Sequence, residues 1–185
     1  IDLTHPFAIK ITRSISRICE ELDQPFIRYE RSIDNISNAF LIKKFSDLGN
    51  YDLKNKSILL ALGVRQLKEA YTFLSSSGAN VYARVLANPE SIRKTLSSPI
   101  QKTNFAILNP SAYGNGKIEK ALIRKWHIAG VICRQSGGRN EILWHQICLS
   151  MGINLWLLER PIEFKHVDSV DSYEKLIKRL KSINM

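Results

Sequence analysis

The sequence has few residues that could cross-link it, bind a metal or anchor it in a membrane. Its three cysteines are isolated and odd in number, so neither a disulfide framework nor a paired-cysteine zinc site is indicated. The four histidines show no metal-ligand spacing, and we expect no metal. The longest apolar run, Ile58 to Leu62, is far too short to span a bilayer. These features favour a cytoplasmic protein that is held together by its own core.

Charge is the strongest compositional signal. The 27 basic and 17 acidic residues give a formal net charge of +10, which favours anionic partners: nucleic acid, anionic lipid, a phosphate cofactor or a polycarboxylate. A basic cluster near the end of the chain fits the solvated face of a terminal helix: Lys175, Lys178, Arg179 and Lys181. Basic residues are not interleaved with exposed aromatics. We therefore expect no nucleic acid as partner, and because the apolar runs are short we expect no membrane partner either.

The first fifty residues predict part of a domain. Apolar residues recur at steps of three and four from Pro6 to Leu22, which predicts an amphipathic helix, and Pro25 to Tyr29 predicts a short strand. The mixed stretch 31–56 predicts a connection with a short helix around 39–47. One helix and one or two strands cannot cover both faces of a sheet. We therefore expect residues 1–52 to be the remainder of a domain with an upstream segment. They should leave a sheet edge and an apolar helix face exposed and be the half more sensitive to proteolysis.

From residue 53 the pattern becomes regular. Apolar runs alternate with turns and amphipathic runs, as a parallel sheet with crossover helices requires. The predicted strands are Ser57–Leu62, Asn80–Leu86, Asn104–Leu108, Gly130–Arg134 and Asn154–Leu158. Helical stripes are predicted around 64–74, 118–122, 143–151 and 170–180. Alternating strands and helices predict a doubly wound α/β domain over residues 53–185.

Ligands of such sheets bind outside the carboxyl ends of the strands, so the strand exits are the candidate sites. The first exit, Asp2 to Ala8, places the carboxylate of Asp2, the hydroxyl of Thr4 and the imidazole of His5 at the start of a helix. Capping of free helix N–H groups is an equally good explanation for Asp2 or Thr4.

The second exit contains Gly63 and Arg65. A glycine here would let a phosphate approach the helix N-terminus, although a single glycine after a strand is also an ordinary turn. About twenty residues further on, Arg84 falls in the second strand of the domain, where a dinucleotide fold carries an acid for the ribose or a basic group for a 2′-phosphate. An arginine there favours NADPH over NADH.

The third exit runs from Arg134 to Gly138. Ser136, Gly137 and Gly138 offer N–H donors at a helix start, and Arg134 can bind a phosphate bidentately. Ser-Gly-Gly is also compatible with a simple flexible turn. If the strand order is flavodoxin-like and the first and fourth strands of this domain are adjacent, the second and third exits would face the same crevice.

Together these stretches resemble the precorrin-6A reductases of cobalamin biosynthesis, including the cobalt-precorrin-6A enzymes. The motifs that carry the resemblance are Asp2-Leu3-Thr4-His5-Pro6-Phe7-Ala8, Ala83-Arg84-Val85-Leu86, Ser136-Gly137-Gly138 and Glu159-Arg160-Pro161. The resemblance implies two Rossmann-like parallel-sheet domains, the first incomplete here. It also implies NADPH-dependent reduction of one double bond in a tetrapyrrole macrocycle that carries many carboxylates. The basic composition suits such a substrate.

The candidate site residues follow from the exits and the resemblance. His5 and Asp2 are the catalytic candidates and Thr4 the substrate-binding one; the cofactor-binding candidates are Gly63, Arg65, Arg84, Arg134, Ser136, Gly137 and Gly138. His5 is a candidate proton donor because imidazole exchanges protons near neutral pH, and ordering of its loop is an equal alternative. The rival hypothesis is a non-catalytic α/β module that binds a nucleotide or sugar phosphate in the same crevice without oxidising NADPH.

Overall fold

The computed structural model describes residues 1–33, 38–109, 115–161 and 167–183. Their contacts divide them into two compact units. The smaller unit comprises the described residues of Ile1–Asn35, Ser136–Gly138 and Arg160–Met185, and the larger unit those of Ile36–Gln135 and Arg139–Glu159. None of the helices in these ranges is long and apolar enough to cross a membrane.

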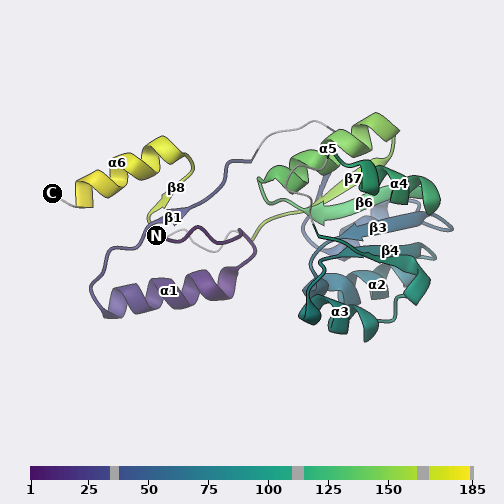
Figure 1. The fold of residues 1–185 in the computed structure, drawn as a ribbon, viewed down its shortest axis with the longest axis horizontal. Coiled ribbons are helices and arrows are strands. Elements are labelled where there is room, and N and C mark those ends of the chain that lie inside the picture. Colours follow the sequence, from purple (N-terminus) through teal and green to yellow (C-terminus); the bar gives the residue numbers. More distant parts are fainter. Residues whose placement is uncertain (34–37, 110–114, 162–166, 184–185) are drawn as a thin grey trace. The chain divides into compact units, whose positions relative to one another are not determined.

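The larger unit is built on a parallel sheet of six described strands (Figure 1). These are β2 (Phe40–Ile42), β3 (Ser57–Ala61), β4 (Asn80–Val85), β5 (Phe105–Ile107), β6 (Ile128–Arg134) and β7 (Asn154–Leu158). They lie side by side in the order β2-β7-β6-β3-β4-β5, and every pairing is parallel. The five strands expected here all form close to their predicted bounds.

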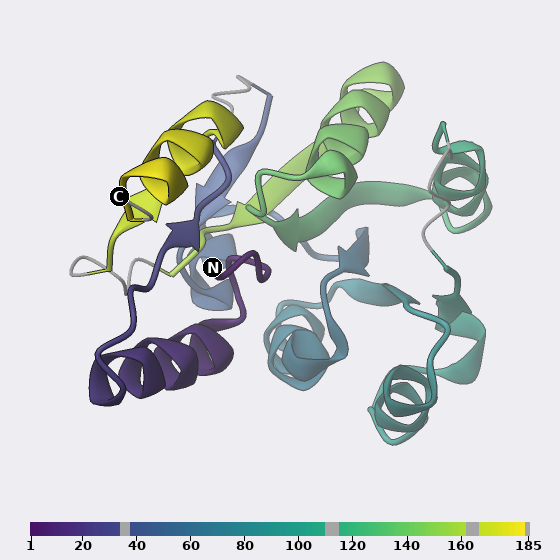
Figure 2. The ribbon, with the colours of Figure 1, turned by 60° about the vertical axis from the view of Figure 1, so that its left-hand side comes forward.

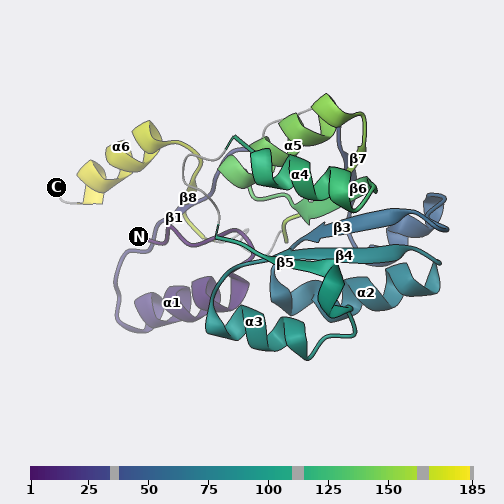
Figure 3. The ribbon, with the colours of Figure 1, turned by 45° about the vertical axis from the view of Figure 1, so that its right-hand side comes forward.

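Helices cover both faces of this sheet, which makes it a three-layer α/β sandwich. They are α2 (Leu67–Ser76), α3 (Pro89–Leu96), α4 (Lys117–Lys125) and α5 (Arg139–Met151), with 3₁₀ turns η1 (Phe45–Asn50), η2 (Val64–Gln66) and η3 (Lys102–Asn104). Figure 3 shows α4 and α5 on one face and α2 and α3 on the other. Because both faces are covered, the central strand β3 is a continuous apolar run, and Ile58, Leu59 and Leu60 are fully buried.

The strand order is not the flavodoxin-like one considered above. Counted from β3, the strands lie in the order 3-2-1-4-5, with β2 in the sixth position, which is the order of dinucleotide-binding folds. β3 and β6 are nevertheless neighbours, paired from Ser57 with Ile128 to Ala61 with Cys133. The point where the chain reverses its direction across the sheet therefore lies between the carboxyl ends of β3 and β6.

The smaller unit is built on a short pair of parallel strands. β1 (Arg28–Tyr29) pairs with β8 (Ser169–Val170), and Asp2 forms a parallel bridge to Arg28. Helices α1 (Ile9–Glu21) and α6 (Tyr173–Ile183) lie on opposite sides of this pair (Figure 2). Because all three extended segments run in the same direction, their carboxyl ends meet at one edge.

Helix α1 buries little of its surface. Its buried residue is Thr12, whereas the apolar side chains of Ile11, Ile15 and Ile18 are exposed. The exposed apolar face that we expected in the first fifty residues is thus present, and the sensitivity of this segment to proteolysis stays a prediction.

Some local structure differs from the sequence-based expectation. The helix expected around 39–47 is strand β2 followed by η1. Strand β2 pairs with β7, and Phe45 and Leu48 of η1 are buried, so packing overrides the local pattern. Helix α1 begins at Ile9 instead of Pro6, after a turn in which the Ala8 N–H donates to the His5 carbonyl at 2.7 Å.

The division into units also differs from the boundary expected at residue 52. The described residues of 36–52 belong to the larger unit, because β2 extends its sheet. Helix α6 belongs to the smaller unit, because β8 pairs with β1. Segments from both halves of the sequence therefore build the smaller unit.

Candidate functional site

Three predicted cofactor residues lie at the carboxyl ends of the neighbouring strands β3 and β6, a place called the β3–β6 edge below. Gly63 follows β3 and is the N-cap of η2, Arg65 lies within η2, and Arg134 is the last residue of the neighbouring strand β6. Arg65 is exposed, whereas Gly63 and Arg134 are half-buried.

Gly63 allows a close approach to the backbone at this edge. A Cβ at Gly63 would lie 2.9 Å from Nη2 and 3.1 Å from Nη1 of Arg134, so any side chain would displace the guanidinium. The Nε of Arg134 donates to Oε1 of Gln66 at 2.8 Å, which orients the guanidinium plane. The lack of a side chain at Gly63 therefore lets the Arg134 guanidinium lie close to the backbone after β3. An ordinary turn does not need such a close contact.

Positive charge is concentrated at the same point. Burial lowers the pKa of the Arg134 guanidinium, and the neighbouring charge of Arg65 lowers this pKa further. Both effects penalise the cation, and an anion bound between the two guanidiniums would offset both. The arrangement favours a phosphate or pyrophosphate at the carboxyl ends of β3 and β6.

Arg84 does not join this group. It is the next-to-last residue of β4, and its Nη2 forms an ion pair with Oε1 of Glu119, in the first turn of α4, at 3.4 Å. The Arg84 side chain is 10% exposed and that of Glu119 is 13% exposed. The side chain is thus held on the sheet face that α4 covers.

The turn Ser136–Gly138 belongs to the smaller unit. Gly137 has φ +61°, and a Cβ there would lie 2.8 Å from Nη2 of Arg160 and would also collide with the carbonyl oxygen of Ser32. A Cβ at Gly138 would lie 2.9 Å from Nη1 of Arg31. The glycines of this turn therefore make room for Arg160 and Arg31 of the smaller unit, whereas Gly63 makes room for Arg134.

Asp2 is the centre of a buried network in the smaller unit. Nη1 of Arg28 donates to Oδ2 of Asp2 at 2.6 Å, and the Thr12 hydroxyl donates to the same oxygen at 2.6 Å. The backbone N–H of Thr4 donates to Oδ1 at 2.8 Å. Asp2 is 2% exposed and Arg28 1% exposed. The predicted catalytic carboxylate is therefore enclosed in an ion pair that ties α1 to β1.

Hydrogen bonding keeps Asp2 ionised despite its burial. Burial raises the pKa of this carboxyl, but the hydrogen bonds from Thr12 and Thr4 and the charge of Arg28 outweigh that effect, and the pKa lies below its ordinary value. A general acid at neutral pH would need a raised pKa. Asp2 positions its neighbours and is not placed to transfer protons.

Thr4 and His5 follow Asp2 at the carboxyl edge of the smaller unit. The Thr4 hydroxyl lies 3.3 Å from the hydroxyl of Thr12, and Nδ1 of His5 accepts the N–H of Phe7 at 3.2 Å. Because Nδ1 acts as acceptor, the neutral ring carries its proton on Nε2. His5 thus orders its loop and also holds a proton on its other nitrogen.

Three charged residues of this network, Arg28, Glu30 and Arg160, were not among the predicted site residues. The Nε of Arg28 donates to Glu30 at 2.7 Å, and the other carboxylate oxygen of Glu30 accepts from Nη1 of Arg160 at 2.9 Å. Arg160 lies in the Glu-Arg-Pro motif that contributed to the family resemblance, which was its sequence signal. Arg28 and Glu30 had none, because charged residues in and directly after a short strand are typical of a solvated edge.

The buried thiols show no sign of reactivity. Burial raises the pKa of Cys133 well above its ordinary value and that of Cys148 to about 12. Within the part of the chain that the structure describes, His, Cys, Asp and Glu side chains form no group that could hold a metal ion.

The chain is similar to known reductases over nearly its whole length. A family model described as precorrin-6x reductase CbiJ/CobK matches residues 1–181. The cobalt-precorrin-6A reductases of Synechocystis sp. and Methanocaldococcus jannaschii are 29% and 28% identical over 87% and 98% of this chain. The precorrin-6A reductase of Mycobacterium tuberculosis is 23% identical over 95% of it.

The relatives are longer than this chain. It spans 62% of the length of the Synechocystis protein, 72% of the archaeal one and 68% of the mycobacterial one. A solved structure of CobK precorrin-6A reductase matches with a TM-score of 0.74 and 16% identity, over 97% of this chain and 70% of that one, which supports the fold alone. From the match over residues 1–181, the chain belongs to the precorrin-6x reductase family, CbiJ/CobK.

Proposed function

We propose that this chain carries the cofactor site and the substrate-facing loops of an enzyme that reduces a double bond of precorrin-6A or cobalt-precorrin-6A with NADPH. The observation that carries the proposal is the Arg134 guanidinium beside Gly63, with the charge of Arg65 close enough to lower the Arg134 pKa. Both arginines lie where the chain reverses its direction across a sheet with dinucleotide-binding strand order. The names of the relatives supply the substrate.

The residues at the β3–β6 edge fit the phosphates of a nicotinamide cofactor. When bound, such a cofactor supplies the hydride. A single glycine stands at the exit of β3 instead of a glycine-rich loop. Arg134 and Arg65 would therefore supply much of the anion binding that backbone N–H groups provide in the usual dinucleotide site.

Thr4 and His5 are the substrate-facing groups in this proposal. Both follow the buried Asp2, which fixes the backbone of Thr4 through its N–H. The Thr4 hydroxyl would bind the macrocycle, and Nε2 of His5 would hold a proton for the carbon next to the one that is reduced. Asp2 would act only as a positioning residue.

Replacing His5 by Asn tests the proton-donor role. The Asn side-chain oxygen can accept the Phe7 N–H in place of Nδ1, so the loop should keep its order while the Nε2 proton is lost. We expect turnover to fall by about a hundredfold with unchanged NADPH affinity. Steady-state kinetics and NADPH titration check this. Parental turnover in the variant would reduce His5 to a loop-ordering residue.

Replacing Arg84 by Ala tests the choice of NADPH over NADH. If Arg84 turns from Glu119 to a 2′-phosphate, its loss should weaken NADPH binding by about 1.5–3 kcal/mol and leave NADH binding nearly unchanged. Glu119→Gln is the matched control, because it breaks the same ion pair and keeps the Arg84 charge. Equal losses for both cofactors in Arg84→Ala would show that Arg84 only supports the packing of α4.

The activity itself is tested with the purified protein. It should oxidise NADPH only in the presence of precorrin-6A or its cobalt form. NADPH binding without reduction of either macrocycle would favour a non-catalytic module that binds nucleotides.

A further inference from the structure

We propose that the smaller unit contains a pocket that binds a carboxylate side chain of the substrate, with Arg160 and Arg31 as its cationic groups. The identity of the ligand rests on the proposed function; that the ligand is an anion follows from the cationic lining of the pocket.

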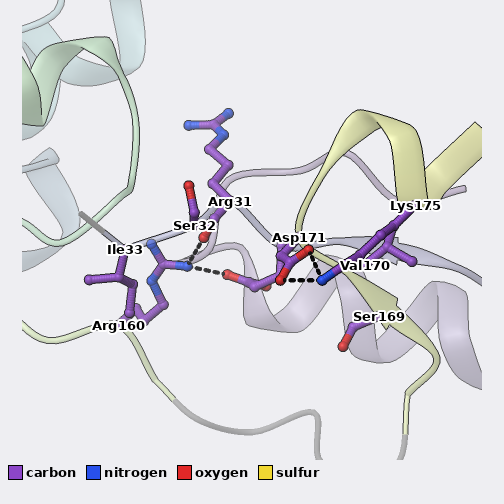
Figure 4. A pocket seen from close by; sticks show the side chains of 9 residues that line it. Arg31, Ser32, Ile33, Arg160, Ser169, Val170, Asp171 and Lys175 are labelled. Carbon is purple, nitrogen blue, oxygen red and sulfur yellow. Dashed lines mark hydrogen bonds and ion pairs between the residues drawn. The ribbon is translucent and has the colours of Figure 1, made fainter. Parts of the chain in front are cut away.

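The pocket lies at the carboxyl ends of the parallel strands β1 and β8. Its volume is about 490 Å³. Its lining residues are Glu30, Arg31, Ser32, Ile33, Arg160, Ser169, Val170, Asp171 and Lys175, and Figure 4 shows all nine side chains. The carboxyl edge of a parallel sheet is where open α/β folds bind their ligands.

Arg160 is held in place before any ligand arrives. Its side chain is 8% exposed, and Nη1 donates to Oε1 of Glu30 at 2.9 Å and to the Arg31 carbonyl at 2.6 Å. Glu30 is itself held by Arg28, which pairs with Asp2. These ion pairs form a series of alternating charges from buried Asp2 to the pocket, and the last member of the series is the cation Arg160. A guanidinium whose orientation is already fixed loses little entropy on binding a carboxylate.

The remaining charges leave the pocket cationic. Among the lining side chains that the structure describes, three are basic and two are acidic. Asp171 is paired with Lys175 at 2.8 Å, and Glu30 is shared between Arg28 and Arg160. Figure 4 shows the Asp171–Lys175 pair and the Arg160 contacts as separate groups of interactions. The charge of Arg31 is therefore the surplus, and the hydroxyls of Ser32 and Ser169 add hydrogen-bonding groups for an anion.

A carboxylate of the macrocycle and a phosphate of the cofactor share the chemistry that this pocket recognises. The cofactor phosphates are assigned above to Arg65 and Arg134, which belong to the larger unit. The pocket is therefore assigned to the substrate, and the two sources can be separated by titrating each ligand.

The test uses uroporphyrin III, a stable fluorescent tetrapyrrole with carboxylate side chains, and NADPH as a second, independent ligand. Arg31→Ala removes the surplus charge from a half-buried position, and Arg160→Lys keeps the charge but loses the fork of donors. Lys181→Ala is the control, because it removes one exposed charge of α6 that does not line the pocket. Circular dichroism verifies that each variant is folded; if Arg160→Lys does not fold, Arg31→Ala carries the test alone.

We expect Arg31→Ala and Arg160→Lys to lower the affinity for uroporphyrin about tenfold, Lys181→Ala to change it less than about twofold, and all three to keep parental NADPH affinity. Parental uroporphyrin affinity in both pocket variants overturns the proposal, as does a loss no larger than in Lys181→Ala. A loss of NADPH affinity reassigns the pocket to the cofactor and also overturns it. Failure of the reductase activity, with the uroporphyrin result as expected, would refute the proposed function and leave a carboxylate pocket.

Discussion

Replacing Asp2 by Asn is expected to lower the free energy of unfolding of the smaller unit by about 3–5 kcal/mol, because it leaves the charge of buried Arg28 without its closest carboxylate. The loss should be local. Amide hydrogen exchange of β1 and α1 should accelerate strongly, while the buried strands of the larger unit should change little. Chemical denaturation monitored together with exchange measures both effects.

The matched control for Asp2 is Glu21→Gln. Glu21 forms an exposed ion pair with Arg17, with side chains 63% and 73% exposed, so its loss should cost well under about 1 kcal/mol. If Asp2→Asn were as mild as this control, the network around Asp2 would not hold the unit together.

The effect of Asp2 should depend on pH in a defined direction. Its pKa is lower in the folded state than in the unfolded chain, so the stabilisation is fully present above about pH 4, the range of an ordinary carboxyl, and is lost as the pH falls through the folded value. The difference in stability between the parental protein and Asp2→Asn should therefore be constant near neutral pH and shrink only below about pH 4. A difference that grows on acidification would contradict the assignment.

Replacing Gly137 by Ala should also be strongly destabilising, for two separable reasons. The backbone has φ +61°, which costs an alanine about 1–2 kcal/mol, and the new Cβ would collide with Ser32 and Arg160, which costs about 1–3 kcal/mol more. Thermal or chemical denaturation measures the sum.

Gly152→Ala separates the two costs. Gly152 has φ +64°, and a Cβ there would have no described neighbour within 4 Å, so this variant carries the backbone strain alone. Equal losses in the two variants would mean that the close approach of Arg160 to Gly137 has no energetic weight. Unchanged NADPH affinity in the folded Gly137→Ala protein would remove the Ser136–Gly138 turn from the predicted cofactor site.

Strands and their exits could be predicted from the sequence where packing or function leaves a pattern in neighbouring residues. Strands β3 and β7 are apolar runs because both sheet faces are covered, and Gly63 with Arg65 marks the exit of β3. Helix α3 was missed although its start is clear in the sequence: the Asn88 side chain accepts the Ser91 N–H, and Pro89 opens the first turn.

What the sequence could not predict depends on contacts between distant segments. Strand β2 is three residues long and is defined by its pairing with β7, which follows more than a hundred residues later. Glu30 and Arg160 form one ion pair although 130 positions separate them. Arg84 was placed correctly in a strand, but strand periodicity alone did not indicate that α4 would cover its face and supply Glu119.

The most direct test of the central claim is a titration of NADPH against the parental protein and Arg134→Ala, monitored by NADPH fluorescence, with Arg134→Lys as the variant that keeps the charge. If the β3–β6 edge holds the cofactor phosphates, Arg134→Ala should lose about 1.5–3 kcal/mol of binding free energy, and Arg134→Lys should recover part of it. Parental NADPH affinity in a folded Arg134→Ala protein would contradict the account and move the cofactor away from this edge.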